Sequence, residues 1–242
     1  MKNVSFISGN ILNKESVDSA TKGIDVVVHL ATSHNRGKEE RNIEGSKNII
    51  NACKERKVKK FIFISSMAAK RKNLDAYGKT KLKIEKIIKS SGLKYVILRL
   101  GIIYSEDNLS LIGKSLKFPL IIPIIGSGKY KINPVYIEDV VEVIAVATKN
   151  KKAIGKEYDI AGAENISFNE VIEICKEKFK IRKLNLHIPI FLAALVFRFV
   201  PITSIESVKG IEEDTNADIA GMIKDLKINP INFKEKIKNV TI

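Results

Sequence analysis

Short runs of β-branched and aromatic residues alternate with longer helical patterns over the first two thirds of the 242-residue chain. This alternation is typical of a parallel sheet covered by helices, because a crossover between parallel strands usually contains a helix. Residues 25–31 (DVVVHLA) and 60–66 (KFIFISS) are nearly continuous apolar runs, as expected of strands buried on both faces. The sequence therefore predicts an α/β protein with helices on both faces of a parallel sheet.

The expected elements follow one another in a regular order. Strands are expected at 4–8, 25–31, 60–66, 95–98 and 157–160. Helices are expected at 16–22, 42–57, 77–90 and 138–148. Ser167 and Glu170 have capping-box spacing and should begin a helix that ends near Phe179. The tail beyond that helix is expected to be largely helical.

Residues 101–135 interrupt this pattern, since they hold three of the six prolines and four of the 14 glycines. We interpret this segment as part of a small cap inserted between elements of the core. The predicted Rossmann-like core is 1–100 and 136–162, and the predicted substrate-binding cap is 101–135 and 163–242.

The net charge of +15 comes from lysines spread along the whole chain, because 35 of the 42 basic residues are Lys. Proteins that read nucleic acids concentrate Arg with stacking aromatic residues, whereas aromatic residues here are 7% and Trp is absent. We therefore expect no dedicated nucleic-acid partner. Cys53 and Cys175 stand alone, which fits a reducing, cytoplasmic environment.

The most apolar stretch is Ile188–Val200, which Pro189, Arg198 and Pro201 interrupt or bound. It is shorter than the run of about 20 apolar residues that a membrane-spanning helix needs. We interpret it as a docking helix, with peripheral membrane contact as the weaker alternative.

Tyr77-Gly-Lys-Thr-Lys81 places a phenol and an ammonium four residues apart, on one face of an expected helix. A free phenol has a pKa of about 10, and a neighbouring ammonium lowers that pKa, so that tyrosine becomes a usable acid or base. With six Tyr and 35 Lys in the chain, such a pair also arises by accident. Ser65 and Ser66 either form a turn or present hydroxyls at a strand end that faces the ligand crevice.

In its order of KFIFISS, YGKTK and YVILRLG, the chain resembles the NAD-dependent epimerases and dehydratases, also called extended or atypical short-chain dehydrogenases. The resemblance runs from about Val4 to Phe179. Other segments that resemble family landmarks are SGNIL (8–12), DVVVHLAT (25–32), Asn42 with Gly45-Ser46, PVYIEDV (134–140) and KEYDIAG (156–162). The tail, with IPIFLAALVFRF and DLKINP, is similar to the complex-I-associated branch and its relatives.

The resemblance implies a Rossmann-like fold that binds NAD or NADP and exchanges hydride with a small-molecule substrate. Tyr77 is the implied catalytic acid/base, Lys81 would hold the nicotinamide ribose and lower the tyrosine pKa, and Ser66 would orient the substrate oxygen. The implied cofactor contacts are Asn10, Ile11, Leu30, Ala31, Thr32, Ser65, Tyr77, Lys81, Leu100, Gly101 and Ile103.

The family opens with a strand, a Gly-x-x-Gly-x-x-Gly turn and a helix whose N-terminus binds pyrophosphate, and this chain has no such glycine pattern. Gly126-Ser-Gly128 lies inside the expected cap and not between a strand and a helix. We therefore expect an N-terminally truncated sheet without the family's first two strands. Three explanations stay open: a fragment or misassigned start, an authentic truncated protein without cofactor chemistry, and a partner chain that supplies the segment.

Smaller departures bear on the substrate and on metals. Ile102 stands where many sugar-nucleotide enzymes have Asn, which favours a substrate more apolar than a nucleotide sugar. The three histidines are scattered without ligand spacing, so we expect no metal site, and His29 would only line the cofactor edge. Asp139 is expected to be a structural residue at a helix start.

Two main functions from different classes remain after this comparison, beside a third, a nucleic-acid-binding derivative that would use the positive charge. The first is an NAD(P)-dependent oxidoreductase, epimerase or dehydratase that uses Tyr77, Lys81 and Ser66. The second is a non-catalytic Rossmann-like binding or assembly protein, for which the complex-I-like tail speaks. A homodimer is compatible with both functions.

Overall fold

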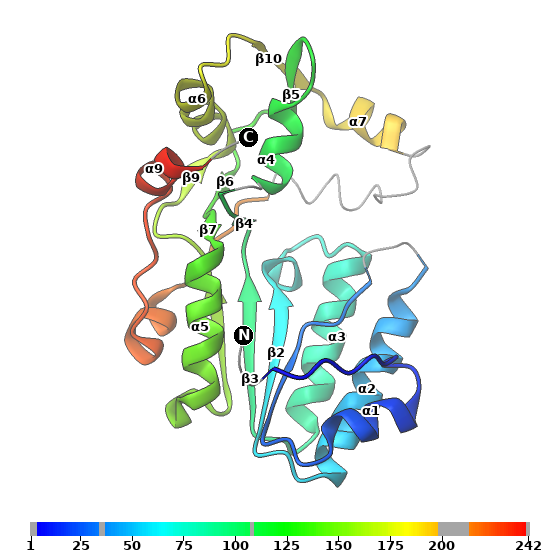
Figure 1. Cartoon of the computed structure of the whole chain (residues 1–242). Helices are drawn as coiled ribbons and strands as arrows, with labels where there is room; N and C mark the ends of the chain where they lie inside the picture. Colours follow the sequence, from blue (N-terminus) through cyan, green and yellow to red (C-terminus); the bar gives the residue numbers. More distant parts are fainter. Residues whose placement is uncertain (1–3, 34–36, 107–108, 198–212, 241–242) are drawn as a thin grey trace.

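Four parallel strands form the central sheet, in the order β1–β2–β3–β8 (Figure 1). The computed structural model describes residues 4–33, 37–106, 109–197 and 213–240. Within it the strands are β1 (Val26–His29), β2 (Lys60–Ser66), β3 (Tyr95–Leu100) and β8 (Lys156–Ile160). The parallel sheet and the helices around it confirm the predicted α/β, Rossmann-like class.

Helices cover the two faces of this sheet, with α2 (Glu39–Glu55) and α3 (Ala76–Ser90) on one side and α5 (Ile137–Lys149) on the other (Figure 1). Side chains alternate along β2, so Phe61 and Phe63 pack with α2 and α3. Ile62 and Ile64 pack with α5 and β8 on the opposite face. The apolar run of β2 is therefore continuous because both of its faces are core.

Near the N-terminus, one strand prediction is wrong and a second is confirmed over a shorter range. Val4–Ser8 forms no strand, and Val4, Phe6 and Ile7 are exposed. Strand β1 is shorter than the predicted 25–31, and its three valines are only half-buried. Strand β1 is short and half-buried because it is the end strand of the sheet and has β2 as its only described neighbour. Helix α1 (Lys14–Thr21) confirms the first predicted helix, and a left-handed Gly23 follows it.

Above the carboxyl ends of the strands lies a second cluster of elements, built around its own apolar core (Figure 1). Three small sheets occur there: β4 (Ile103–Tyr104) with β7 (Val135–Tyr136), β5 (Ile121–Ile125) with β10 (Leu184–Ile188), and β6 (Lys131–Ile132) with β9 (Ile166–Ser167). The helices are α4 (Ser110–Leu116), α6 (Phe168–Phe179) and α7 (Ile190–Phe197). The predicted capping box of Ser167 and Glu170 begins α6, as expected.

The tail is only partly helical among its described residues. It contains strand β10, then the π-helical turn η4 (Met222–Leu226), the short helix α9 (Phe233–Lys236) and the turn η5 (Ile237–Asn239). Met222, Leu226 and Ile228 pack with α5 and β8, so this part of the predicted cap lies against the core. The rest of the predicted domain division stays a prediction.

The apolar stretch Ile188–Val200 supplies the end of β10 and all of α7, and its last three residues lie outside the described part of the chain. In α7, Phe191 and Leu195 are exposed. None of the described helices has the length and apolar character needed to cross a membrane. The predicted docking or peripheral membrane role stays a prediction.

Candidate functional site

The candidate site begins where β2 ends and two short turns lead into α3. Ser66 is extended and begins the 3₁₀ turn η1 (Met67–Lys70), and its hydroxyl accepts a hydrogen bond from the Ala68 amide at 3.2 Å. Asp75 caps α3 by accepting a hydrogen bond from the Gly78 amide at 2.7 Å. A Cβ added at Gly78 would lie 2.5 Å from the Ala68 carbonyl oxygen. The glycine in the Tyr-x-x-x-Lys motif therefore lets the first turn of α3 sit against η1.

This close approach brings the three predicted catalytic residues together. The hydroxyl of Tyr77 is hydrogen-bonded to the Ser66 side chain. Nζ of Lys81 lies 5.7 Å from the centroid of the Tyr77 ring and donates a hydrogen bond of 2.8 Å to the Ile64 carbonyl. It also lies 4.8 Å from the centroid of the Phe63 ring, in cation–π range. The ammonium is thus held between β2 and α3 by the strand itself.

Burial dominates the protonation of this group. It raises the pKa of Tyr77, and Asp75 raises it further, while the hydrogen bond with Ser66 lowers it. Burial also lowers the pKa of Lys81 to about 8, against the opposing charge of Glu85. The net shift of the Tyr77 pKa is therefore upward because burial outweighs the other effects, whereas a lowered pKa was predicted from the neighbouring ammonium. At neutral pH Tyr77 is protonated and suited to donate a proton.

Ser65 has a different environment from Ser66. Its hydroxyl donates a hydrogen bond of 2.5 Å to Oε1 of Glu85, a carboxylate that is fully buried. Arg99 donates to both oxygens of the same carboxylate, from Nε at 3.0 Å and from a terminal nitrogen at 2.6 Å. Ser65 is therefore engaged in binding β2 to α3 and β3, although it was predicted as a cofactor contact.

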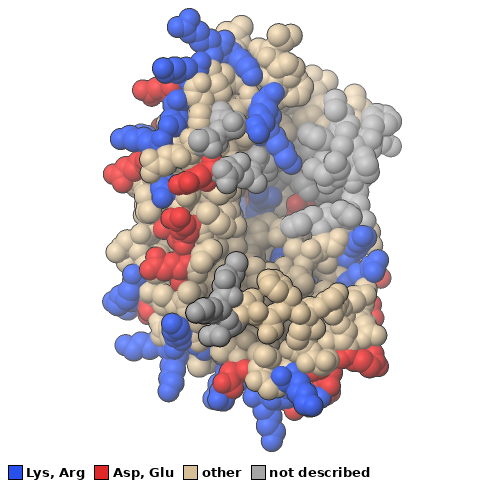
Figure 2. All heavy atoms as spheres, in the orientation of Figure 1, with Lys and Arg blue, Asp and Glu red and all other residues tan. Residues whose placement is uncertain are grey.

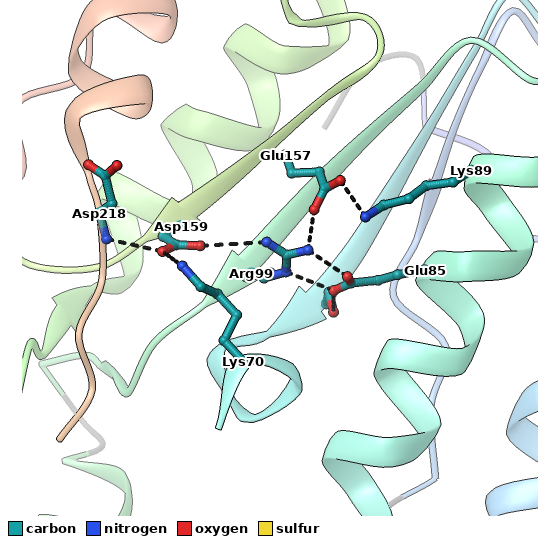
Figure 3. A network of polar contacts seen from close by, with 8 residues as sticks. Lys70, Glu85, Lys89, Arg99, Glu157, Asp159 and Asp218 are labelled. Atoms are coloured by element: carbon teal, nitrogen blue, oxygen red, sulfur yellow. Dashed lines mark hydrogen bonds and ion pairs between the residues drawn. The ribbon is translucent and has the colours of Figure 1, made fainter. Parts of the chain in front are cut away.

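Arg99 is the centre of a wider network that joins four elements around the site (Figure 3). Besides Glu85, it contacts Glu157 and lies 3.9 Å from Asp159, both on β8. Asp159 also accepts from Lys70 at 2.5 Å and from the Asp218 amide at 3.0 Å. Because Lys70 ends η1, the network ties the turn that follows Ser66 to β8 and to the tail.

Sequence reasoning missed this network. Its signal was a set of charged residues inside otherwise apolar strands, namely Arg99 in YVILRL and Asp159 in KEYDI. Buried charges of this kind are almost always paired. Glu85 lies one helical turn after Lys81, and its position was the third indication of a buried charge network.

The other predicted cofactor contacts divide into two groups. Leu30 and Ala31 are exposed and Thr32 is half-buried just after β1, while Leu100, Gly101 and Ile103 are half-buried at and beyond the end of β3. Both segments lie at the carboxyl edge of the sheet, as Ser66 does, which is where doubly wound sheets bind ligands. Gly101 donates its amide to the Ile160 carbonyl at 2.8 Å.

Asn10 and Ile11 form the second group, in the turn before α1. The Asn10 side chain accepts from the Leu12 amide at 3.0 Å, so it is used by its own turn. The Ile11 side chain fills the space above Gly45 of α2, where an added Cβ would meet it at 2.4 Å. The Ile11 carbonyl accepts from Asn48 at 3.0 Å. These contacts attach the turn to α2.

His29 is buried at the end of β1, next to the site. Its Nε2 is 2.9 Å from the Ser46 hydroxyl, which donates to the Asn42 carbonyl. Its Nδ1 has no hydrogen-bond partner among the described residues. Burial, together with the nearby charge of Lys81, lowers the pKa of His29 to about 4. His29 is therefore neutral at physiological pH. Within the described ranges, no group of three or more potential ligand side chains gathers for a metal.

The residues present fit one end of a dinucleotide. Ser66, Tyr77 and Lys81 supply a hydroxyl, a phenol and an ammonium at the carboxyl edge, which suits a ribose and a reacting oxygen. For the pyrophosphate, the sequence has no glycine-rich turn between a strand and a helix. The fit is therefore confined to the nicotinamide-ribose end.

A parallel sheet with helices on both faces and a Ser–Tyr–Lys cluster at its carboxyl edge defines a Rossmann-like α/β fold. A family described as NAD(P)H-binding matches residues 1–116. This match covers 116 of the 242 residues, so it states what the N-terminal part of the chain is similar to.

Individual relatives are distant. The chain is 28% identical over 218 residues to an uncharacterized UDP-glucose epimerase of Bacillus subtilis, a match that spans 77% of this chain and 68% of the relative. It is 28% identical over 168 residues to the mouse NADH dehydrogenase (ubiquinone) 1 alpha subcomplex subunit 9, across 66% of this chain and 44% of the subunit.

Solved structures share the fold over almost the whole chain. The UDP-glucuronic acid 4-epimerase of Bacillus cereus, solved with UDP-glucuronic acid and NAD, matches with a TM-score of 0.75 and 24% identity. The match covers 98% of this chain and 79% of the epimerase.

Proposed function

We propose that this chain is an NAD(P)-dependent oxidoreductase, epimerase or dehydratase of the short-chain dehydrogenase type that uses Tyr77, Lys81 and Ser66. The observation that supports this function is the convergence of Ser66, Tyr77 and Lys81, through a hydrogen bond and a 5.7 Å approach, at the carboxyl edge of the sheet. If the motif were an accidental pair of surface side chains, its lysine would be solvated. Lys81 is instead only 3% exposed.

The roles follow from the contacts of each group. Tyr77 donates its proton to a carbonyl oxygen as hydride arrives at the carbon, or accepts it in the reverse direction. Ser66 hydrogen-bonds the same substrate oxygen and holds it beside the phenol. Lys81 supplies positive charge next to Tyr77, which favours the phenolate once the substrate takes the proton. A bound NAD(P) would supply the hydride chemistry, and Tyr77, Ser66 and Lys81 would hold the ribose and the reacting oxygen beside it.

The substrate in this proposal is more apolar than a nucleotide sugar. Ile102 packs against the apolar core of the cap, and Ile103 is half-buried beside it. Neither side chain offers the amide that would hydrogen-bond a sugar hydroxyl. Partners other than this substrate, including a second copy of the chain, stay predictions.

A second function, a non-catalytic binding or assembly protein, is supported by one specific observation. The similarity to a subunit of NADH dehydrogenase fits this alternative. In that case the Arg99 network and the Ser66–Tyr77 contact would be structural.

Calorimetric titration of the chain with NAD and with NADP separates the two functions. We expect saturable binding of at least one cofactor in the enzyme, and no heat at about 1 mM of either would refute it. Cofactor binding without hydride transfer to a panel of carbonyl compounds would favour the non-catalytic protein.

The role of Tyr77 is tested by Tyr77→Phe, with Tyr95→Phe as its matched control. Tyr95 is half-buried at the opposite end of the sheet, where β3 begins. We expect Tyr77→Phe to lower turnover by about 10²-fold or more, the usual worth of a positioned acid, while the affinity for the cofactor changes little. Equal turnover in the two variants would mean that Tyr77 is not the proton donor.

A further inference from the structure

A hollow of about 860 Å³ lies at the amino end of the sheet, away from the candidate site. It is formed where β1, β2 and β3 begin and where α2 and α5 end. Its lining comprises Asp25, Val26, Cys53, Lys54, Lys57, Val58, Lys59, Lys60, Ser91, Gly92, Leu93, Lys94, Thr148, Lys149, Lys151 and Ile154. We call it the lysine hollow. In Figure 2, Lys and Arg side chains project from this lower end of the molecule.

The lysine hollow is far richer in Lys than the rest of the chain. Seven of its 16 lining residues are Lys, against 35 of 242 in the whole sequence. Asp25 is the one acidic residue of the lining, and it pairs with Lys59 at 3.1 Å. The hollow therefore carries a large excess of positive charge.

Helix ends explain only part of this charge. Carbonyls at the end of a helix attract cations, and Lys60 already meets that need at the end of α5. Its buried ammonium donates to the carbonyls of Ala147, Thr148 and Asn150 at 2.8, 2.8 and 2.9 Å. Lys54 and Lys149 stand in the last turns of α2 and α5, where a cation also suits the helix dipole. The helix ends do not explain Lys57, Lys94 and Lys151, which also line the hollow.

Five lysines of the hollow remain after these pairings. They are exposed, and none forms an ion pair with a described residue: Lys54, Lys57, Lys94, Lys149 and Lys151. Lys57 also has a φ of 54°, the left-handed backbone that favours Gly or Asn. Like charges gathered around one concave surface repel one another, which a bound anion would relieve.

We propose that the lysine hollow binds a compact anion carrying several phosphate groups. Lysine ammonium groups act as point charges toward phosphate oxygens, without the planar fork of Arg. The lining holds neither Arg nor an aromatic ring on which a nucleic-acid base could stack. The ligand chemistry is thus a short polyphosphate or a polyphosphorylated small molecule, held mainly by charge.

The test is calorimetric titration of the whole chain with tripolyphosphate at about 0.1 M salt, where the screening length is about 10 Å. The variant is Lys54→Glu with Lys94→Glu and Lys151→Glu. The control is Lys47→Glu with Lys114→Glu and Lys129→Glu, which makes the same charge change at exposed lysines outside the hollow. Lys47 and Lys54 lie on the same helix, α2.

We expect saturable binding to the unmodified chain, a loss of affinity of about tenfold or more in the hollow variant, and a change within about twofold in the control. Equal weakening in both variants, or no binding to the unmodified chain, would overturn the proposal. Tighter binding of oligothymidylate through the same lysines would overturn it in favour of a nucleic-acid surface.

Two further measurements keep the result interpretable. If the charge-reversed variant unfolds, the neutral Lys54→Gln, Lys94→Gln and Lys151→Gln variant replaces it, and unchanged affinity there overturns the proposal. Added NAD should leave tripolyphosphate affinity unchanged, because the candidate site lies at the other end of the strands. This independence also separates the outcome from the fate of the proposed function.

Discussion

Replacing the buried carboxylate Glu85 with Gln tests whether the Arg99 network holds the site together. Glu85 is fully buried and accepts three hydrogen bonds, one from Ser65 and two from Arg99. Gln keeps one acceptor oxygen, but it turns NH₂ donors toward groups that are themselves donors and leaves Arg99 short of one counter-charge. Breaking one partner of a buried pair costs about 3–5 kcal/mol, and we expect about 3 because Arg99 keeps Glu157.

Glu157→Gln is the matched control, because Glu157 contacts the same guanidinium from a more exposed position. Its side chain is 28% exposed, and its other partner, Lys89, is 37% exposed. Solvent-accessible pairs contribute about 1 kcal/mol or less. In urea denaturation we therefore expect Glu85→Gln to lower the free energy of unfolding at least about twice as much as Glu157→Gln.

Thermal melting gives a second measure of the same difference. For a chain of this length, about 3 kcal/mol corresponds to a fall in Tm of roughly 6–12 °C. If Glu85→Gln and Glu157→Gln lowered the free energy of unfolding equally, burial would not decide how much each contact with Arg99 contributes, and the prediction would be refuted.

Two further predictions concern stability. The pKa of Lys81 is about 8 in the folded chain and about 10.5 in the unfolded one, so between these pH values the unfolded chain binds more protons and the wild type gains stability as pH rises. Below pH 8, Lys81→Met should therefore be more stable than the wild type by up to about 3 kcal/mol. Denaturation at several pH values should show this advantage shrinking by pH 10.5. A stability difference that does not change with pH would contradict the prediction. Gly162→Ala would place a Cβ 1.9 Å from the Pro134 carbonyl oxygen and should cost about 1–3 kcal/mol in urea denaturation, whereas Gly113→Ala, whose nearest contact is 3.3 Å, should cost less.

The elements predicted well are those whose burial follows directly from their own residues. The bounds of β2 are those predicted, because KFIFISS is apolar on both faces and the strand has helices on both sides. Helices α3 and α5 each begin one residue before the predicted start, and α6 begins at its capping box. In each case local pattern and tertiary packing agree.

Other elements depended on neighbours that lie far away in the sequence. DVVVHLA reads as a doubly buried strand, but β1 is at the end of the sheet and is only half-buried. No strand was predicted at Ile121–Ile125, because residues 101–135 interrupt the regular pattern. This segment pairs with β10 in a sheet of two strands, where Pro123 is tolerated. Neither the position of a strand in a sheet nor a distant partner is contained in a local pattern.

The candidate site shows the same division. The grouping of Ser66, Tyr77 and Lys81 was predicted from motif order, and the structure places the three side by side. The direction of the Tyr77 pKa shift was not predicted, because desolvation depends on everything that packs around the phenol. The use of Ser65 by Glu85 could not be read from the serine pair, since adjacent strand residues point to opposite faces.

The position of β1 at the end of the sheet constrains how this chain can associate through hydrogen bonds. Two identical copies related by a twofold axis can join their β1 edges only in antiparallel fashion. A strand that continues the parallel order of β1 and β2 must instead come from a different segment of polypeptide. The direction of a strand added to this edge therefore distinguishes self-association from completion of the sheet by another sequence. Isotope-edited infrared spectra or a structure would show that direction.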